Sequence, residues 1–454
     1  MLSAVNFLNY IDRSVMSVVL EGVKDDFLLG DAEGGLVATV FIVVYMLFSP
    51  LGGLVGDRFN RKRMVAVGVG LWSVATVTSG LAQDYEQLLV SRALVGIGEA
   101  GYAAVAPAMI ADLYRRERRG RMLAYFYLAI PLGYAFGYLL GGIVAGNHEA
   151  FLAIIGLGGV ETEGWRVALC VAGAPGLLFA AIALSMVEPR RGASEENYVQ
   201  SSTLLRSRPE LEKLSLKALV SSARRLFRSP AWRINTGGMT LMTFTLGGIA
   251  WWLPTFFQRA HGMNVNEAGT YCGGVLVVAG LLGTFVGGHL GDRAFSKGPG
   301  GYFRVSGWGL VLGAPFVVAT VLAQTSFLAL LCVFVAEFFL FLNTGPLNAA
   351  LVGCVPAYLR ATAVAVNVLF IHALGDAVSP PLMGWISEVA GPLLVDADGV
   401  DGGAEGLALA IALTAVPLAL GGVWLIRGAA RIHGQTGGLL HEDGEARSSP
   451  SLFL

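Results

Sequence analysis

The sequence contains 454 residues, of which 55% are hydrophobic and only 14% are charged, and its formal net charge is −1 at pH 7. Soluble domains carry about a quarter charged residues, so this composition and a mean hydropathy of +0.64 exclude an ordinary soluble protein. The net charge says nothing about partners, and no basic stretch has the character of a nucleic-acid-binding patch, so we expect no nucleic-acid partner. Four cysteines stand in apolar stretches without metal-ligand spacing, so we interpret them as small core residues and expect no metal site. They are Cys170, Cys272, Cys332 and Cys354.

Apolar stretches of about 20 residues, the length that a helix needs to cross a bilayer, follow one another along the chain. They predict an all-α integral membrane protein with twelve transmembrane helices. Only eleven residues precede Asp12, so we expect the first stretch to lack part of its native N-terminal sequence, and we expect no cleavable signal peptide. The twelve stretches lie near residues 1–20, 34–56, 64–82, 86–112, 121–146, 165–187, 232–257, 267–291, 302–323, 326–351, 360–388 and 405–427.

The loops between these stretches alternate in charge. The loop after the second stretch and the loop after the fourth are basic, with Arg58, Arg61, Lys62 and Arg63 in one and five arginines within 115–121 in the other. The intervening loops are acidic. Because cytoplasmic loops carry the excess of Lys and Arg, both termini are predicted to be cytoplasmic, which requires an even number of spans.

One long polar segment divides the chain. Residues 187–233 carry ten Lys and Arg against five Asp and Glu, which indicates a cytoplasmic linker. Leucines recur in it at roughly helical spacing among basic residues, so it is either a helix on the anionic inner leaflet or a solvated connector. We expect an N-terminal six-helix bundle over 1–187, the linker over 188–231, a C-terminal six-helix bundle over 232–430 and a disordered cytoplasmic tail over 431–454.

The two halves of the sequence contain an internal repeat. Residues 52–58 read GGLVGDR and residues 287–293 read GGHLGDR, with five identities in seven positions. A weaker similarity is the proline-to-arginine spacing: fourteen residues separate Pro107 from Arg121 in the first half and Pro346 from Arg360 in the second. The repeat predicts a duplicated bundle, in which two six-helix halves are related by pseudo-symmetry.

Ionisable residues stand inside two of the apolar stretches. Arg92 and Glu99 are seven residues apart and therefore share one face of a helix. Asp12 and Arg13 are adjacent, so they point in different directions, and Arg13 lies one turn from Asn9. Charges at this depth are costly and mark a pathway or a binding site. The alternatives are a fixed structural ion pair for Arg92 and Glu99, and an interfacial position for Asp12 with Arg13 reaching the headgroups.

The second half carries a weaker polar set. Glu337 and Asn343 stand in the tenth stretch, and His372 lies one turn before Asp376 in the eleventh. We interpret Glu337, Asn343 and His372 as candidate cavity residues, together with Asn9, Arg13, Arg92 and Glu99. His372 and Asp376 could form a titrating pair, and a histidine satisfied at a helix interface is an equally good interpretation.

Several motifs resemble a known family. The octapeptide GDRFNRKR at 56–63 resembles the loop signature between the second and third helices of the major facilitator superfamily. More specifically, NYIDRSV at 9–15, RALVGIGEAGYAAVAPAMIADLY at 92–114 and FYLAIPLGYAFGYLLGG at 126–142 resemble the spinster branch. The close resemblance covers roughly residues 7–143, and the second half resembles the superfamily only generally.

The resemblance implies residue roles. Asp12, Arg13 and Glu99 match the positions that the family is thought to use for proton-linked switching. The turn with Gly56, Asp57, Arg58 and Arg61, together with Asp112, matches the superfamily element that locks the cytoplasmic side. The second copy of the turn lacks the basic run, so an equal locking role there is doubtful.

No catalytic motif is present: the sequence contains no G-x-S-x-G, no nucleotide-binding lysine motif and no metal-ligand cluster. We therefore expect no enzyme and no cofactor, and a secondary transporter that is coupled to protons. The resemblance implies an amphiphilic substrate such as sphingosine 1-phosphate or a lysophospholipid. A multidrug or organic-anion carrier and a non-transporting membrane sensor are the alternatives. We expect a monomer in a bacterial inner membrane whose partners are its substrate, protons and membrane lipids.

Overall fold

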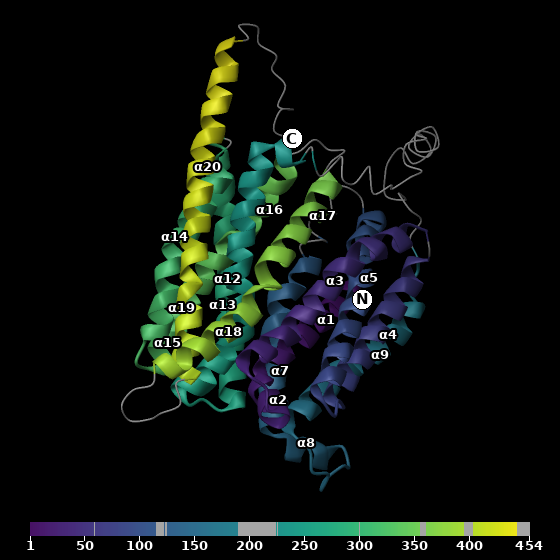
Figure 1. Ribbon diagram of the computed structural model, residues 1–454. Coiled ribbons are helices and arrows are strands. Elements are labelled where there is room, and N and C mark those ends of the chain that lie inside the picture. Colours follow the sequence, from purple (N-terminus) through teal and green to yellow (C-terminus); the bar gives the residue numbers. More distant parts are fainter. Residues whose placement is uncertain are drawn as a thin grey trace. The chain divides into compact units, whose positions relative to one another are not determined.

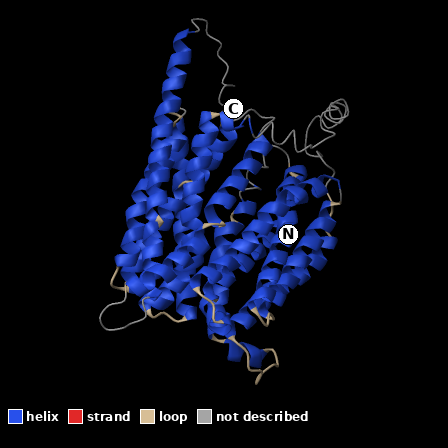
Figure 2. Ribbon diagram, in the orientation of Figure 1, coloured by secondary structure: helices blue, strands red, loops and turns tan. Residues whose placement is uncertain are grey.

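The structure, a computed structural model, describes residues 1–454 except 59, 115–121, 123–124, 189–223, 225, 299, 355–359, 395–402 and 443–454. For residues 50, 53–54, 56–58, 104, 108, 111, 352, 360–362, 365 and 433–442 it describes only the backbone. Within these described ranges the regular structure is helical, and no strand occurs (Figures 1 and 2).

Helices occupy the six apolar stretches of the first half. Two short helices, α2 and α8, lie outside these stretches on the predicted outer side. The elements are α1 (Leu2–Val18), α2 (Leu20–Phe27), α3 (Asp31–Arg58), α4 (Arg61–Gly80), α5 (Tyr85–Leu113), α7 (Ala129–Gly146), α8 (His148–Ile154) and α9 (Gly164–Leu184).

Helices also occupy the six stretches of the second half, but the last three stretches are interrupted. The elements are α12 (Pro230–His261), α13 (Val265–Phe295), α14 (Gly301–Leu322), α15 (Ser326–Leu342), α16 (Thr344–Gly353), α17 (Arg360–Ile371), η3 (His372–Asp376), α18 (Ser379–Ala390), η4 (Gly391–Leu393), α19 (Gly403–Leu413) and α20 (Ala415–Glu442). By length and composition, nine helical segments of the described chain could cross a membrane.

Proline and local caps explain where helices begin. Pro346, Pro380 and Pro417 stand in the first turns of α16, α18 and α20, where the missing N–H is tolerated, and each follows an interruption of a predicted span. Asp84 caps α5 by accepting a hydrogen bond from the Gln87 N–H at 2.8 Å. Asn60 caps α4 in the same way, 3.0 Å from the Arg63 N–H.

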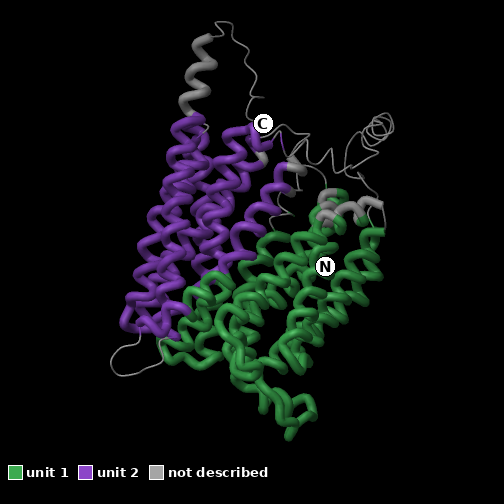
Figure 3. The backbone as a smooth tube through the Cα atoms, viewed as in Figure 1, with its two compact units in different colours: residues 1–212, 250–274, 380–388 green, residues 213–249, 275–379, 389–454 purple. Residues whose placement is uncertain are grey.

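The described chain separates into two compact units (Figure 3). Unit 1 contains residues 1–212, 250–274 and 380–388, and unit 2 contains residues 213–249, 275–379 and 389–454. In unit 1, α1 packs on α7, α3 packs on α5, and α4 packs on both α5 and α9. In unit 2, α14 packs on α15 and α20. Unit 1 therefore holds the predicted charged residues of α1 and α5.

Glycines allow these helices to pack closely. A Cβ atom on Gly98 of α5 would lie 2.7 Å from the Trp72 backbone nitrogen of α4. On α7, a Cβ atom on Gly137 would lie 2.7 Å from the Ile11 carbonyl oxygen, and one on Gly133 would lie 2.8 Å from the Phe7 carbonyl oxygen of α1. Only glycine permits such approach, which is a common device where membrane helices meet. These contacts account for part of the high glycine content.

Candidate functional site

A cluster of charged and polar side chains lies inside unit 1, between α1 and α5. Asn9, Asp12, Arg92 and Glu99 are each at most 4% exposed, and the Arg13 side chain is 13% exposed. Burying four ionisable groups in one cluster carries a large desolvation cost. Apolar residues would pack in the same place without that cost. The structure therefore brings together the five switch and cavity candidates of the first half.

Arg13 and Glu99 form an ion pair between α1 and α5. The Arg13 Nε donates to Glu99 Oε2 at 2.7 Å, and its Nη2 lies 2.6 Å from the same oxygen. The guanidinium carbon also lies over three aromatic rings, 5.1 Å from the centroid of Tyr10, 4.9 Å from that of Phe41 and 4.7 Å from that of Tyr45. Cation–π attraction adds to the ion pair and keeps the guanidinium plane in place.

Arg92 shares α5 with Glu99, but its surroundings are different. Its guanidinium carbon lies 5.2 Å from the centroid of Phe41. Its Nε and Nη1 atoms find no hydrogen-bond acceptor among the described residues. Each unsatisfied buried donor costs about 1–3 kcal/mol. Arg92 is thus a buried cation with donors available to an anionic group or to water.

Asp12 points away from Arg13, as adjacent helical positions require. Its Oδ2 accepts a hydrogen bond from the Thr76 hydroxyl of α4 at 3.5 Å, and its Oδ1 has no partner in the described part of the chain. Asn9 Nδ2 and Glu99 Oε1 likewise have none. Unpartnered polar atoms from α1 and α5 therefore gather in one buried place, and a proton, water or polar substrate group could satisfy them.

The predicted cytoplasmic gate is described in part. The Arg61 Nη1 lies 2.5 Å from Asp112 Oδ2, and the Arg61 backbone N–H donates to Glu188 Oε1 at 2.9 Å. Gly56, Asp57 and Arg58 form the last turn of α3, where only the backbone is described. Arg61 and Asp112 are thus brought together, and the pair joins the start of α4 to the end of α5. Glu188, a carboxylate at the N-terminus of α4, is an additional member.

A second charge network lies at the predicted outer end of unit 1. Arg259 at the end of α12 donates to Glu21 of α2 through Nε and Nη2, both at 2.8 Å. It also donates to Asp31 of α3, through Nη1 at 2.9 Å and Nη2 at 2.7 Å. Lys24 pairs with Asp31 and lies 3.2 Å from Glu21. This outer network, Glu21, Lys24, Asp31 and Arg259, connects a helix of the second half of the chain to two helices of the first.

Sequence reasoning missed the outer network. It used the acidic residues near 21–33 only to orient the membrane spans. The available signal was an arginine at the outer end of the seventh stretch, where the positive-inside rule does not expect one.

The candidate residues of the second half lie in unit 2. Glu337 on α15 is 3% exposed, and its Oε2 has no partner among the described residues. Asn343 ends α15, where its Nδ2 donates to the Phe339 carbonyl at 2.6 Å. The His372 Nδ1 lies 3.0 Å from the Asp376 carboxylate within the π-helical turn η3. π-Helical turns are frequent at functional positions.

Comparison with known proteins identifies the family. Residues 2–380 match the family model described as the Major Facilitator Superfamily. A protein of Danio rerio named as a sphingosine-1-phosphate transporter is 35% identical over 405 residues, covering 85% of this chain and 75% of that protein. Protein spinster homolog 1 of Xenopus tropicalis is 34% identical over 403 residues, covering 85% of this chain and 71% of that protein. The chain belongs to the spinster family of the major facilitator superfamily.

Two further comparisons point to the same family. Protein spinster of Drosophila melanogaster is 35% identical over 393 residues, and this chain covers 60% of its length. A crystal structure described as a bacterial homolog to the human lysosomal transporter spinster, inward-facing and unoccupied, matches with a TM-score of 0.82 and 26% identity. The match covers 95% of this chain and 96% of that one.

A solved D-xylose–proton symporter, with a TM-score of 0.67 and 18% identity, shows the same fold. The predicted family and the all-α membrane fold are confirmed, and the family is one of membrane transporters and not of enzymes.

Proposed function

We propose that this spinster protein is a secondary active transporter that moves a lipid-like amphiphile by proton-coupled alternating access. The substrate class is that of lysophospholipids and sphingolipids. The observation that carries the proposal is the Arg13–Glu99 pair, in which one oxygen of a fully buried carboxylate holds an arginine from another helix and the other oxygen has no partner among the described residues. We expect a single protomer that needs no cofactor.

Glu99 would act as the proton switch, with Asp12 and Arg13 as its neighbours. A proton on Oε1 would neutralise the carboxylate and remove the countercharge of Arg13. Because a cation without a countercharge is costly in this environment, Arg13 would then seek another anion. The phosphate of an amphiphile is such an anion, and the unsatisfied donors of Arg92 could bind it as well. The name of the zebrafish relative supports a phosphate-bearing lipid.

Alternating access needs a barrier at each end of the route. We assign the cytoplasmic barrier to the α3–α4 turn, where Arg61 and Asp112 hold the start of α4 against the end of α5. We assign the outer barrier to the outer network around Arg259. Both assignments rest on the predicted orientation, with both termini in the cytoplasm of a bacterial cell. The six-plus-six division at the 188–231 linker belongs to the same proposal.

A small organic-anion carrier is the second candidate. The partnerless donors of Arg92 favour it, because they would bind any anionic head regardless of an attached chain. Glu337, Asn343 and His372 would contribute to substrate recognition in either case.

Flux into proteoliposomes under an imposed pH gradient tests the proposal. The wild-type protein should accumulate a lysolipid only when the gradient is present. Glu99→Gln, which mimics the protonated carboxyl, should abolish accumulation and retain exchange between internal and external substrate. Glu86→Gln is the matched control, because Glu86 is an exposed carboxylate in the first turn of the same helix.

Two outcomes would change the assignment. Unaltered accumulation in Glu99→Gln removes the proton switch. Uptake of water-soluble organic anions without lysolipid flux selects the second candidate.

A further inference from the structure

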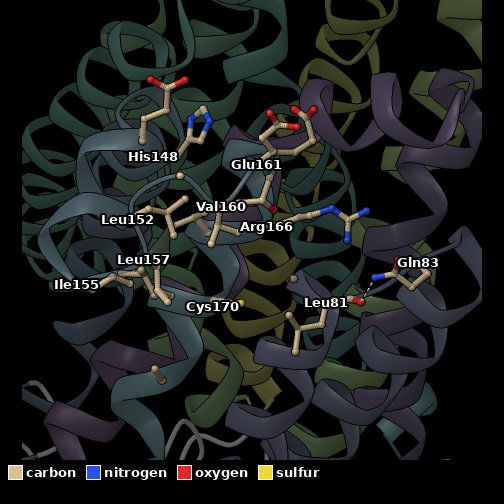
Figure 4. Close-up of a pocket in the computed structure, with 18 residues that line it drawn as sticks. Leu81, Gln83, His148, Leu152, Ile155, Leu157, Val160, Glu161, Arg166 and Cys170 are labelled. Atoms are coloured by element: carbon tan, nitrogen blue, oxygen red, sulfur yellow. Dashed lines mark hydrogen bonds between the residues drawn. The ribbon is translucent and has the colours of Figure 1, made fainter.

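A groove lies at the predicted outer end of unit 1, apart from the α1–α5 cluster. It is formed by α8, the loop that follows it, the end of α4 and the first turns of α9, and its volume is about 1220 Å³. Figure 4 shows His148, Glu161, Leu152, Ile155 and Leu157 among the residues that line this groove. Ligand pockets commonly enclose about 300–1,000 Å³, so the groove is large enough for a lipid-sized molecule.

One wall of the groove is apolar and exposed. Leu81, Ile155, Leu157 and Val160 are 59%, 56%, 50% and 52% exposed. The wall continues along α9 to Ala174, which is exposed and lies within the apolar membrane span Gly164–Leu184. An alkyl chain lying on this wall could therefore pass from the outer loop to the membrane-spanning part of α9.

The rim of the groove is acidic. Glu149, Glu161 and Glu163 line it and are exposed, and no described residue forms an ion pair or hydrogen bond with their carboxylates. The basic side chains that also line the groove have other partners. Arg166 is paired with Asp26 at 2.8 Å and lies 4.3 Å from the centroid of the Trp165 ring. His148 Nδ1 is 3.0 Å from the Ala145 carbonyl oxygen.

We propose that this groove binds an amphiphile with an ammonium head, the head at the carboxylates of Glu149, Glu161 and Glu163 and the alkyl chain on the exposed wall that contains Ile155, Leu157 and Val160. Charge complementarity selects the occupant, because three uncompensated carboxylates repel an anionic head and attract a cationic one. An apolar wall beside them selects a chain over a small cation. The groove is thus a second lipid-binding site with a head preference opposite to that of Arg92.

Photolabelling of the purified full-length protein in lipid nanodiscs tests this site. The probe is a dodecylamine with a diazirine in its chain, and its counterpart is dodecyl phosphate with the same diazirine. Labelled peptides are identified by mass spectrometry. The amine should label residues within 148–174 about fivefold more than the phosphate does, as expected from a few exposed charge contacts.

Variants separate the two parts of the proposal. Glu161→Gln combined with Glu163→Gln should reduce labelling by the amine about fivefold. Glu86→Gln combined with Glu405→Gln removes two exposed carboxylates elsewhere and should leave labelling unchanged. Leu157→Ser, at a position that is 50% exposed, should weaken labelling without changing the charge.

Three outcomes would overturn the proposal: equal labelling by both probes, labelling that is insensitive to the two Glu→Gln changes, or complete competition by tetramethylammonium, which has no chain. These results are independent of the proposed transport function, because labelling does not require flux.

Discussion

Arg13 directs two guanidinium nitrogens at a single oxygen of Glu99, at 2.7 Å and 2.6 Å, from a helix that is 86 residues away along the chain. The arrangement is one-sided: it neutralises the carboxylate electrostatically but leaves Oε1 open to a proton. A symmetric bidentate pair would occupy both oxygens. The pair is therefore suited to being broken, which a purely structural ion pair is not.

The stability of the Arg13–Glu99 pair can be measured directly. Arg13→Met should lower the free energy of unfolding by about 3–5 kcal/mol, because it leaves the Glu99 carboxylate buried without its partner. Adding Glu99→Gln to Arg13→Met should restore much of that loss, so the two changes should be strongly non-additive. Thermal unfolding in detergent measures both effects, with Arg304→Met at an exposed helical position as the control. Simple additivity would show that the two residues are not coupled.

Substitution of Arg92 should affect transport and not stability, in contrast to substitution of Arg13. Because two of its donors are buried without acceptors, Arg92→Met should leave thermal stability unchanged or raise it slightly. Substrate flux in proteoliposomes should nevertheless fall at least about tenfold, since a desolvated cation that binds an anion contributes at least about 1.4 kcal/mol. A loss of stability as large as that of Arg13→Met would contradict the assignment of Arg92 to substrate binding.

The outer network predicts a shift between conformations. Arg259→Gln should favour the state open to the outside, because Glu21 and Asp31 would lose the side chain that joins them to α12. Arg259→Lys should restore closure only in part. The planar guanidinium of arginine donates to both carboxylates at once, and a lysine ammonium lacks this geometry. Spin-label distances between the outer ends of the two halves measure the effect.

The chain offers a matched control for this experiment. Arg166 pairs with Asp26 at 2.8 Å, and both residues belong to the first half. Arg166→Gln should therefore remove an outer ion pair without changing the distance between halves. Equal shifts in Arg166→Gln and Arg259→Gln would mean that general destabilisation, and not loss of the outer network, causes the change.

Asp112 is predicted to hold the cytoplasmic turn. Asp112→Asn should remove the ion pair with the Arg61 guanidinium, which lies 2.5 Å from the carboxylate, and should increase the population of the state open to the cytoplasm about fivefold. Glu86→Gln changes an exposed carboxylate at the opposite end of the same helix and serves as the control. Spin labels at the cytoplasmic ends of the halves report the populations, and unchanged distances would remove the turn from the gate.

The fold was largely predictable, because membrane spans are encoded locally. Among the described residues, helices occupy each of the twelve apolar stretches, and the motifs around Asp12, Asp57 and Glu99 identify the family. The interruptions after Leu342 and at His372–Asp376 were not predicted, since windows of average hydropathy do not register a break within an apolar run. Pro346 and Pro380 were the local signals for them.

The sequence predicted which residues belong to the charged cluster, but it did not predict which of them form ion pairs with one another. Buried charges in α1 and α5 stand out because hydrocarbon makes them costly. Which residue pairs with Glu99 depends on the approach of α1, so helical spacing alone could not choose Arg13 over Arg92. The contact of Arg259 with Glu21 spans 238 positions. Nothing local in the sequence specifies such a contact.

The glycine contacts of α7 have a mechanical consequence. Gly133 and Gly137 place the α7 backbone directly against Phe7 and Ile11 of α1, in the two turns that lead up to Asp12 and Arg13. At these two glycines no side chain of α7 separates the two backbones, and the aromatic pairs Phe7–Phe136 and Tyr10–Tyr134 also join the helices. We therefore expect a displacement of Arg13 to move α1 and α7 together.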